Sequence, residues 1–240
     1  MKNQTAFVTG ADRGLGLALC ENLLAHGWQV FAGQYLPDWN ELDALVDNYP
    51  GKLHLIPLDV ASLESAQNAA KLTAEITHHI DLLINNAGVN TPTKERKIDE
   101  GQDYAEFDRM YQINSVGPLR VVESFGGLLE QGNLKRLAFV SSEAGSIERC
   151  TREAWYGYTM SKAALNRAVK VMFNHLHPQG FTFRLFHPGW VQSYIGGEYN
   201  SEAHLTPVKS AATAVDHFIN PLADEDQLAM YDFAGKKWPW

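Results

Sequence analysis

The sequence predicts a single α/β domain built on a parallel sheet of seven strands, with helices on both faces of that sheet. Two observations predict it. Short apolar runs alternate with amphipathic stretches along the whole chain, and several of these runs are apolar at every position. Strands that are apolar on both faces are typical of a parallel sheet covered on both sides. Strand–helix alternation with right-handed crossovers then gives a doubly wound sheet.

Apolar runs place the strands, and the amphipathic stretches between them place the helices. The clearest strands carry Ala6-Phe7-Val8 and Leu82-Leu83-Ile84, which are apolar throughout. Gly27 and Gly180 stand where two helices should end, and Pro178 helps to end the second of them. The predicted strands are 4–9, 28–33, 52–57, 80–85, 135–141, 181–186 and 228–233. The predicted helices are 14–26, 39–48, 62–78, 104–130, 156–177 and 208–219.

Length and composition favour one domain, 1–240, in a reducing compartment. The 240 residues contain no repeat or linker and can bury one large core. A net charge of −8 argues against nucleic acid and anionic membranes as partners. Cys20 and Cys150 form no CxxC pair and are interpreted as free thiols, so we expect a cytoplasmic protein. The first strand begins too early for a signal peptide, and no apolar run approaches the roughly 20 residues of a membrane span. The nine histidines form no compact metal-binding set, so no metal site is expected.

A glycine-rich turn follows the first strand, in Thr9-Gly10-Ala11-Asp12-Arg13-Gly14-Leu15-Gly16, and a helix follows the turn. Glycines let the backbone turn tightly and approach a pyrophosphate, and the free N–H groups of the helix N-terminus favour an anion. Three glycines alone are weak evidence because turns are rich in glycine. Their place between the first strand and the first helix predicts a nucleotide site.

Tyr158 and Lys162 share one face of the predicted helix 156–177, because they lie four residues apart. A free tyrosine has a pKa of about 10, and a neighbouring positive charge should lower it and make the phenol a usable general acid or base. The same spacing also fits an ordinary pair on a helix surface. Tyr156 is a rival base, but Met160 stands four residues after it, so Tyr158 is preferred.

The chain resembles the classical short-chain dehydrogenase/reductase family over essentially its whole length, in four motifs that follow in order. They are the TGxxxGxG turn, Asn85-Asn86-Ala87-Gly88 after the fourth strand, Tyr158-x-x-x-Lys162 and Pro188-Gly189. The segment 114–120 and the ending 231–240 are similar to sniffer-type carbonyl reductases and C-factor-like members, which is a weaker match. The resemblance implies a single-domain Rossmann fold.

The resemblance also implies the roles of three side chains. Tyr158 should exchange a proton with the substrate oxygen. Lys162 should lower the pKa of that tyrosine and hydrogen-bond the nicotinamide ribose. Asn114, inside the predicted helix 104–130, matches the family asparagine that supports a water relay to the lysine. Asparagine is a poor residue for the middle of a helix, which fits a role in a site, although an exposed helix asparagine is the alternative.

A serine hydroxyl should hold the substrate oxygen, and Ser142 at the end of the fifth strand is the best candidate. It lies sixteen residues before Tyr158, whereas the family usually leaves about thirteen. The segment 143–157 is therefore interpreted as lengthened. Ser141 and Ser146 stay open as substitutes, and a serine that only caps the strand end is the other alternative.

The resemblance carries over a set of cofactor contacts along the carboxyl ends of the strands. Asp59 matches the acidic residue that contacts the adenine, although it could instead start the next helix, for which Ser62 also fits. The positions that should contact the cofactor are Gly10, Asp12, Arg13, Gly14, Leu15, Gly16, Asp59, Val60, Asn86, Ala87, Gly88, Tyr158, Lys162, Pro188, Gly189, Val191 and Ser193.

The choice between the two nicotinamide cofactors depends on the end of the second strand. An acidic residue there would bind the ribose 2′-hydroxyl of NAD, but this chain has Gly33-Gln34-Tyr35. Arg13 resembles the basic residue that NADP-preferring members use. We therefore favour NADP(H). NAD(H) stays the alternative, because no second basic residue stands at Gln34 or Tyr35.

The sequence thus predicts NADP(H)-dependent interconversion of a small-molecule carbonyl and an alcohol. A nucleotide-binding regulatory or signalling protein on the same fold is the alternative, since fold does not fix function. The loops 90–103, 143–157 and 190–207 should set the substrate, whose identity one sequence does not give. By resemblance we expect a homodimer or homotetramer that pairs through the helices 104–130 and 156–177.

Overall fold

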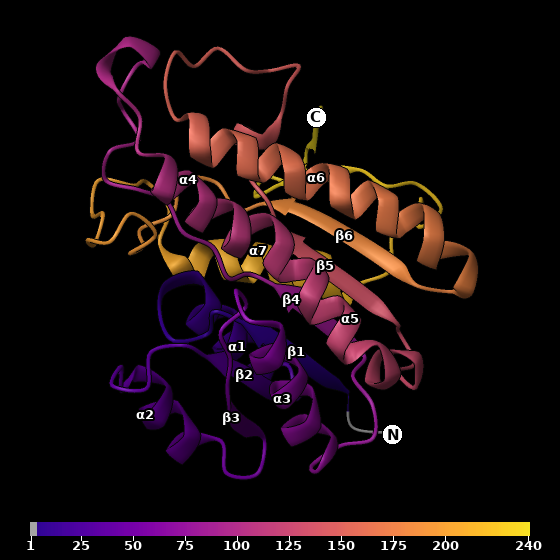
Figure 1. The fold of residues 1–240 in the computed structure, drawn as a ribbon. Helices are drawn as coiled ribbons and strands as arrows, with labels where there is room; N and C mark the ends of the chain where they lie inside the picture. Colours follow the sequence, from indigo (N-terminus) through magenta and orange to yellow (C-terminus); the bar gives the residue numbers. More distant parts are fainter. Residues whose placement is uncertain (1–3) are drawn as a thin grey trace.

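The computed structural model describes residues 4–240 and confirms the doubly wound α/β architecture (Figure 1). The first three residues of the predicted domain 1–240 lie outside that range. Seven strands run parallel in the order β3-β2-β1-β4-β5-β6-β7. The chain order reverses between β1 and β4, which is where ligands bind in open α/β sheets.

The elements follow the predicted alternation closely. The strands are β1 (Thr5–Thr9), β2 (Gln29–Gln34), β3 (Leu53–Pro57), β4 (Leu82–Asn85), β5 (Arg136–Val140), β6 (Thr182–His187), β7 (Met230–Asp232) and β8 (Lys237–Trp238). The α-helices are α1 (Gly14–Ala25), α2 (Glu41–Asn48), α3 (Leu63–Ala74), α4 (Tyr104–Tyr111), α5 (Gly117–Glu130), α6 (Tyr156–Leu176) and α7 (Pro207–Ile219).

The strand count was wrong by one. An eighth strand, β8, pairs antiparallel with β7 and closes the edge of the sheet as a hairpin. It spans only Lys237–Trp238, and a pair of residues is too short to give the alternation by which a strand is identified in a sequence.

The single helix predicted over 104–130 was also wrong. A π-helical segment, Gln112–Val116, separates α4 from α5. Pro118 near the start of α5 lacks an N–H donor, which favours a break in the ladder there. Single-turn π segments occur often at functional sites, and Asn114 lies in this one.

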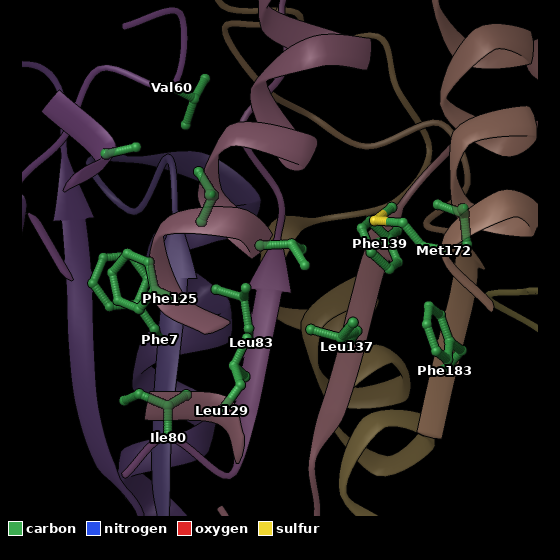
Figure 2. Close-up of a cluster of buried hydrophobic side chains, with 14 of the residues drawn as sticks. Phe7, Val60, Ile80, Leu83, Phe125, Leu129, Leu137, Phe139, Met172 and Phe183 are labelled. Atoms are coloured by element: carbon green, nitrogen blue, oxygen red, sulfur yellow. The ribbon is translucent and has the colours of Figure 1, made fainter. Parts of the chain in front are cut away.

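Helices cover the sheet in two layers, each with its own apolar cluster. One cluster joins α3, α5 and α6 to the sheet. Figure 2 shows part of this cluster, with Phe7, Leu83 and Leu137 among its labelled side chains. Phe7 and Phe125 are fully buried there with ring centroids 4.4 Å apart. The other cluster joins α1, α2 and α7 to the opposite face. Burial of each Phe or Leu side chain stabilises the fold by roughly 1.5 to 3 kcal/mol. The strand ends that carry the site are therefore held by a stable core.

Within residues 4–240, the helices are all too short or too polar to cross a lipid bilayer.

Candidate active site

The glycine-rich turn between β1 and α1 is built for close backbone approach. Gly10 has φ +63°, and a Cβ placed on it would lie 2.8 Å from the Cα of Ala87. A Cβ on Gly16 would collide with the carbonyl oxygen of Gly10. At the N-terminus of α1, the side chain of Arg13 makes no capping hydrogen bond. The turn therefore offers uncapped N–H groups that can donate hydrogen bonds to an anion.

Thr9 ties this turn to the segment after β4. Its hydroxyl oxygen accepts from the N–H groups of Asn86 and Ala87, both at 3.0 Å. The amide nitrogen of Asn86 donates to the carbonyl oxygens of Thr9 and Gly10. The predicted cofactor residues at the ends of β1 and β4 are thus held together as one unit.

Two acidic residues of the predicted cofactor set have defined positions. The Asp12 carboxylate accepts from the N–H groups of Tyr35 and Leu36, so it fixes the turn that follows β2. Asp59 accepts from the N–H of Ala61, while Ser62 caps α3 through the N–H of Ser65. Ser62, and not Asp59, therefore starts that helix.

Arg13 lies in an aromatic sandwich that the sequence did not predict. Its guanidinium carbon is 4.5 Å from the ring centroids of both Trp39 and Tyr194. Trp39 precedes α2, and Tyr194 belongs to the segment 190–207. A Cβ on Gly14 would lie 3.8 Å from the Cβ of Ser193, so this segment lies directly over the glycine-rich turn.

Tyr158 and Lys162 both point inward from α6. Their exposed fractions are 8% and 3%, which excludes the alternative of an ordinary surface pair. The Lys162 ammonium donates to the carbonyl of Val140 at the end of β5, at 3.0 Å. It lies 5.8 Å from the centroid of the Tyr158 ring. Burial lowers the pKa of Lys162 to about 8.

The predicted direction of the Tyr158 pKa was wrong for the protein without cofactor. Burial raises the pKa of Tyr158 to about 12. The Ser142 hydroxyl, close enough to hydrogen-bond the phenol, and the charge of Arg152 act in the opposite direction, while the charge of Glu143 adds to the rise. Desolvation of a phenolate outweighs these contacts, so Tyr158 holds its proton at neutral pH.

Asn114 is 1% exposed, which excludes the alternative of a surface asparagine. Its amide oxygen accepts from the N–H of Val89 at 2.8 Å, and its amide nitrogen donates to the Val89 carbonyl and to the Ser161 hydroxyl. A Cβ on Gly88 would lie 3.4 Å from the Asn114 amide oxygen and 3.6 Å from the Lys162 ammonium. The π-helical segment thus brings Asn114 beside the lysine.

The three candidate serines differ in what they contact. The Ser141 hydroxyl donates to Asn166 at 2.6 Å, and the Ser146 hydroxyl oxygen accepts from the N–H of Arg149. The Ser142 oxygen accepts from the N–H of Ala144, and of the three serines it alone influences the Tyr158 pKa. The geometry favours Ser142 as the partner of the tyrosine.

An ion pair in the segment after β5 flanks the tyrosine. Arg152 binds the Glu143 carboxylate through both terminal nitrogens, at 2.9 and 2.5 Å. The Arg152 guanidinium also lies 5.0 Å from the ring of Trp155, which meets Tyr158 edge-on at 6.2 Å. The hydroxyl of the rival Tyr156 donates to the carbonyl of Glu153 at 3.3 Å and so has a partner other than the residues around Tyr158.

The remaining cofactor positions follow β6. Pro188 accepts a hydrogen bond from the Ser210 hydroxyl of α7 at 2.8 Å. Gly189 has φ +80°, and a Cβ there would press on Phe233. Val191 forms a bridge with Leu205 and holds the segment 190–207 against itself. Among residues 4–240, no cluster of His, Cys, Asp or Glu side chains is arranged to bind a metal ion.

Sequence reasoning did not identify contacts between side chains that come together only in three dimensions. It missed Trp39, which contacts Arg13, and the Glu143–Arg152 pair. His187 is a further buried polar side chain, 8% exposed, at the carboxyl end of β6. No local pattern marks these contacts, because their partners come from distant segments.

Most of the chain is similar to known proteins. Residues 4–204 match the family model described as short chain dehydrogenase. C-signal of Myxococcus xanthus is 40% identical over 164 residues, which are 68% of this chain and 95% of that protein. The 1-hydroxy-2-glutathionyl-2-methyl-3-butene dehydrogenase of Rhodococcus sp. (strain AD45) is 30% identical, covering 90% of this chain and 91% of that one.

Solved structures with this fold include two carbonyl reductases that cover all of this chain and are covered completely by it. The NADPH-bound carbonyl reductase from chicken fatty liver has a TM-score of 0.88 at 28% identity. The carbonyl reductase Sniffer of D. melanogaster has a TM-score of 0.88 at 27% identity.

Proposed function

Because the chain belongs to the short-chain dehydrogenase family, we propose that it is an NADP(H)-dependent oxidoreductase that interconverts a carbonyl compound and an alcohol. The observation that carries the proposal is the grouping of Ser142, Tyr158, Lys162 and Asn114 at the carboxyl edge of the sheet. They lie on the same edge as the uncapped N-terminus of α1. The bound nicotinamide supplies or accepts the hydride, and the protein positions and polarises the substrate.

In the reducing direction Tyr158 acts as the acid. The phenol is protonated at neutral pH, so it has a proton to donate to the substrate oxygen as the carbonyl carbon accepts hydride, although its raised pKa in the cofactor-free protein works against that donation. Ser142 is the second hydroxyl beside that oxygen. Lys162 is a buried cation within reach of the tyrosine ring, and its charge stabilises the phenolate that proton transfer leaves.

Asn114 holds the local backbone in place through the Val89 peptide group. We assign it a positioning role beside Lys162, in line with the water relay that the family resemblance implies.

Residues of the glycine-rich turn fit the pyrophosphate of a dinucleotide. The positive φ of Gly10 and the contact that leaves no room for a side chain on Gly16 both suit a backbone cradle. Gly14 and Leu15 open α1 there. The other groups that would hold the cofactor are Asp12, Asp59, Val60, Asn86, Ala87, Gly88, Tyr158, Lys162, Pro188, Gly189, Val191 and Ser193.

Preference for NADP(H) rests on Arg13 and on the structural neighbours. Arg13 is the basic side chain of the turn, and β2 ends in Gly33-Gln34 with no carboxylate of its own that would repel a 2′-phosphate. The Asp12 carboxylate near that end is already bound to the N–H groups of Tyr35 and Leu36. Similar structures include the NADPH-bound carbonyl reductase from chicken fatty liver and an NADP complex of a carbonyl reductase from Pseudomonas aeruginosa. Both facts support the larger phosphate-bearing cofactor.

The test is a cofactor titration followed by turnover. Quenching of tryptophan fluorescence should give a tighter Kd for NADPH than for NADH, and NADPH should be consumed when aldehydes, ketones or quinones are added. Preference for NADH would overturn the Arg13 assignment. Binding of neither cofactor would overturn the oxidoreductase proposal.

A second candidate function is favoured by one relative. The match to C-signal of Myxococcus xanthus, at 40% identity, supports a signalling protein that binds the nucleotide without needing turnover. Tyr158→Phe separates the two, because it should abolish carbonyl reduction while leaving nucleotide binding and any signalling role intact.

We also propose an oligomeric state and a cellular location. Exposed apolar side chains on the helices that cover the active-site face, among them Tyr111, Leu119, Met160 and Val171, support pairing of two or four copies through that layer. Size-exclusion chromatography with light scattering would test this. The unpaired thiols of Cys20 and Cys150 support a cytoplasmic location.

A further inference from the structure

His187 is the last residue of β6 and precedes Pro188, at the edge of the sheet where the site lies. Leu185, two residues earlier on the same strand face, packs in the cluster beneath α6, so the imidazole also faces the α6 layer. The side chain is 8% exposed, and its Nδ1 has no hydrogen-bond partner within residues 4–240. Buried polar atoms are nearly always paired, so an unpaired one at a site points to a ligand.

A second unpaired ring nitrogen lies beside it. The ring centroid of Trp238, in β8, is 5.7 Å from that of His187. Its Nε1 is also buried without a partner in the described part of the chain. An indole N–H can only donate, so the group that satisfies it must be an acceptor. An imidazole with its proton on Nδ1 offers a second donor to the same acceptor.

The Glu143–Arg152 ion pair connects these rings to the catalytic group. Its charges influence the pKa of both Tyr158 and His187, so both residues lie within short range of the pair. The link continues by direct contact, since Arg152 covers the Trp155 ring and Trp155 meets Tyr158 edge-on. His187, with Trp238 beside it, therefore lies near the residues that flank Tyr158.

We propose that His187 and Trp238 form a second substrate contact that binds an uncharged oxygen of the substrate, separate from the oxygen at Tyr158. The inference rests on the proposed function. It narrows the substrate class to carbonyl compounds that carry a further carbonyl or hydroxyl oxygen near the reacting carbon. It also gives the C-terminal hairpin β7–β8 a role in specificity, because that hairpin delivers Trp238.

The charges around the two rings explain why the oxygen is uncharged. Burial lowers the pKa of His187 to about 4, so the ring is a neutral donor. The carboxylates of Glu143 and Asp232 both act on it, and Asp232 is its register partner on β7. Arg152 is already bound to Glu143. A substrate carboxylate at the two ring nitrogens would face two like charges, whereas a neutral oxygen meets no such repulsion. The Arg149 guanidinium lies over the face of the Trp238 ring, 5.8 Å from its centroid, whereas the indole N–H points outward in the ring plane.

Nuclear magnetic resonance of the protein bound to NADP⁺ tests the contact without turnover. Phenylpropanedione and propiophenone are suitable probes, because they differ only in a second carbonyl that is replaced by CH₂ in propiophenone. Phenylpropanedione should shift the indole N–H signal of Trp238, which Trp238→Phe identifies by its loss, and propiophenone should leave it in place. The Trp39 signal is the internal control, because that ring lies at Arg13. Equal responses to both probes, or no response, would overturn the inference.

Kinetics give an independent readout. In His187→Leu, the ratio of kcat/KM for phenylpropanedione to that for propiophenone should fall by about tenfold, the size of one lost hydrogen bond. His187→Asn keeps an N–H near the Nδ1 position and should restore most of that ratio. A parallel loss for both substrates in His187→Leu would mean that the ring only packs, and would refute the contact.

The two proposals fail separately. If the wild-type protein binds phenylpropanedione with the expected Trp238 shift but NADPH reduces neither compound, the second contact stands and the oxidoreductase proposal falls. If both compounds are reduced without a Trp238 shift, the oxidoreductase proposal stands and the second contact falls.

Discussion

Replacement of Lys162 by methionine should stabilise the folded protein near pH 7 while abolishing hydride transfer. The lysine is 3% exposed, and burial lowers its pKa from 10.5 to about 8. The folded state therefore carries a cost for keeping the ammonium charged, and methionine fills a similar volume without that cost. Turnover should be lost because the cation beside Tyr158 is removed.

The magnitude follows from the change in pKa. Each pKa unit corresponds to about 1.4 kcal/mol, so the penalty on the folded state below pH 8 is about 3 kcal/mol. The variant also loses the hydrogen bond to the Val140 carbonyl, which costs about 2 kcal/mol when the acceptor stays buried. The net gain near pH 7 is therefore about 1 kcal/mol, or a rise in Tm of about 2 to 4 °C.

The stability difference between Lys162→Met and the wild type should depend on pH. Between the folded pKa of about 8 and the unfolded value of 10.5, the unfolded chain binds more protons than the folded one. Stability of the wild type therefore rises with pH across that window, and by pH 9 the penalty falls to about 2 kcal/mol. The advantage of Lys162→Met should shrink by about 1 kcal/mol from pH 7 to pH 9.

The assay is urea unfolding of the cofactor-free protein at pH 7 and pH 9, followed by tryptophan fluorescence. Lys71→Met, on the exposed face of α3, is the matched control for loss of a surface lysine. A difference between Lys162→Met and the wild type that stays constant or grows from pH 7 to pH 9 would refute the reasoning about burial.

Three further predictions concern the tyrosine, the cofactor and the backbone. Tyr158→Phe should lower kcat for carbonyl reduction by at least about a hundredfold with a nearly unchanged Kd for NADPH, and equal turnover in single-turnover kinetics would contradict the role of the phenol. Arg13→Ala should weaken NADPH binding about tenfold by calorimetry with little change for NADH, and an equal loss for both would show that Arg13 does not recognise the 2′-phosphate. Gly127→Ala, in α5 with open space around it, should raise the unfolding free energy by about 1 kcal/mol. Gly132→Ala should lower it by about 1 to 3 kcal/mol, because the added methyl group would collide with the carbonyl oxygen of Ile80; stability changes of the same sign in these two variants would contradict the packing around α5.

The sheet could be predicted because short local runs of apolar residues mark its strands. Ala6-Phe7-Val8 and Leu82-Leu83-Ile84 are apolar on both faces, and they became β1 and β4 with neighbouring registers. The break at Gln112–Val116 could not be predicted from periodicity. Pro118 favours a break near this point, but the Asn114 side chain there binds the Val89 peptide group, a contact across 25 residues that periodicity does not reveal.

The positions of candidate site residues could be predicted where these residues lie in short motifs. They could not be predicted where burial or contacts between distant segments determine the position or the pKa of a side chain. The spacing of Tyr158 and Lys162 placed both on the inner face of α6, as the structure has them. The direction of the Tyr158 pKa depends on how completely residues of other segments, among them Met110 and Ala144, bury the phenol, which no spacing reveals. Trp238 reaches His187 only because the C-terminal hairpin closes the sheet edge.

Isotope labelling can follow the hydride from the cofactor to the substrate. The protein would be incubated with NADPH deuterated at C4 of the nicotinamide, on its transferable face, together with a carbonyl compound that it consumes. The alcohol would then be analysed by mass spectrometry. We expect one deuterium on the carbinol carbon in the wild type and no labelled alcohol with Tyr158→Phe. An unlabelled alcohol, or equal labelling with Tyr158→Phe, would contradict it.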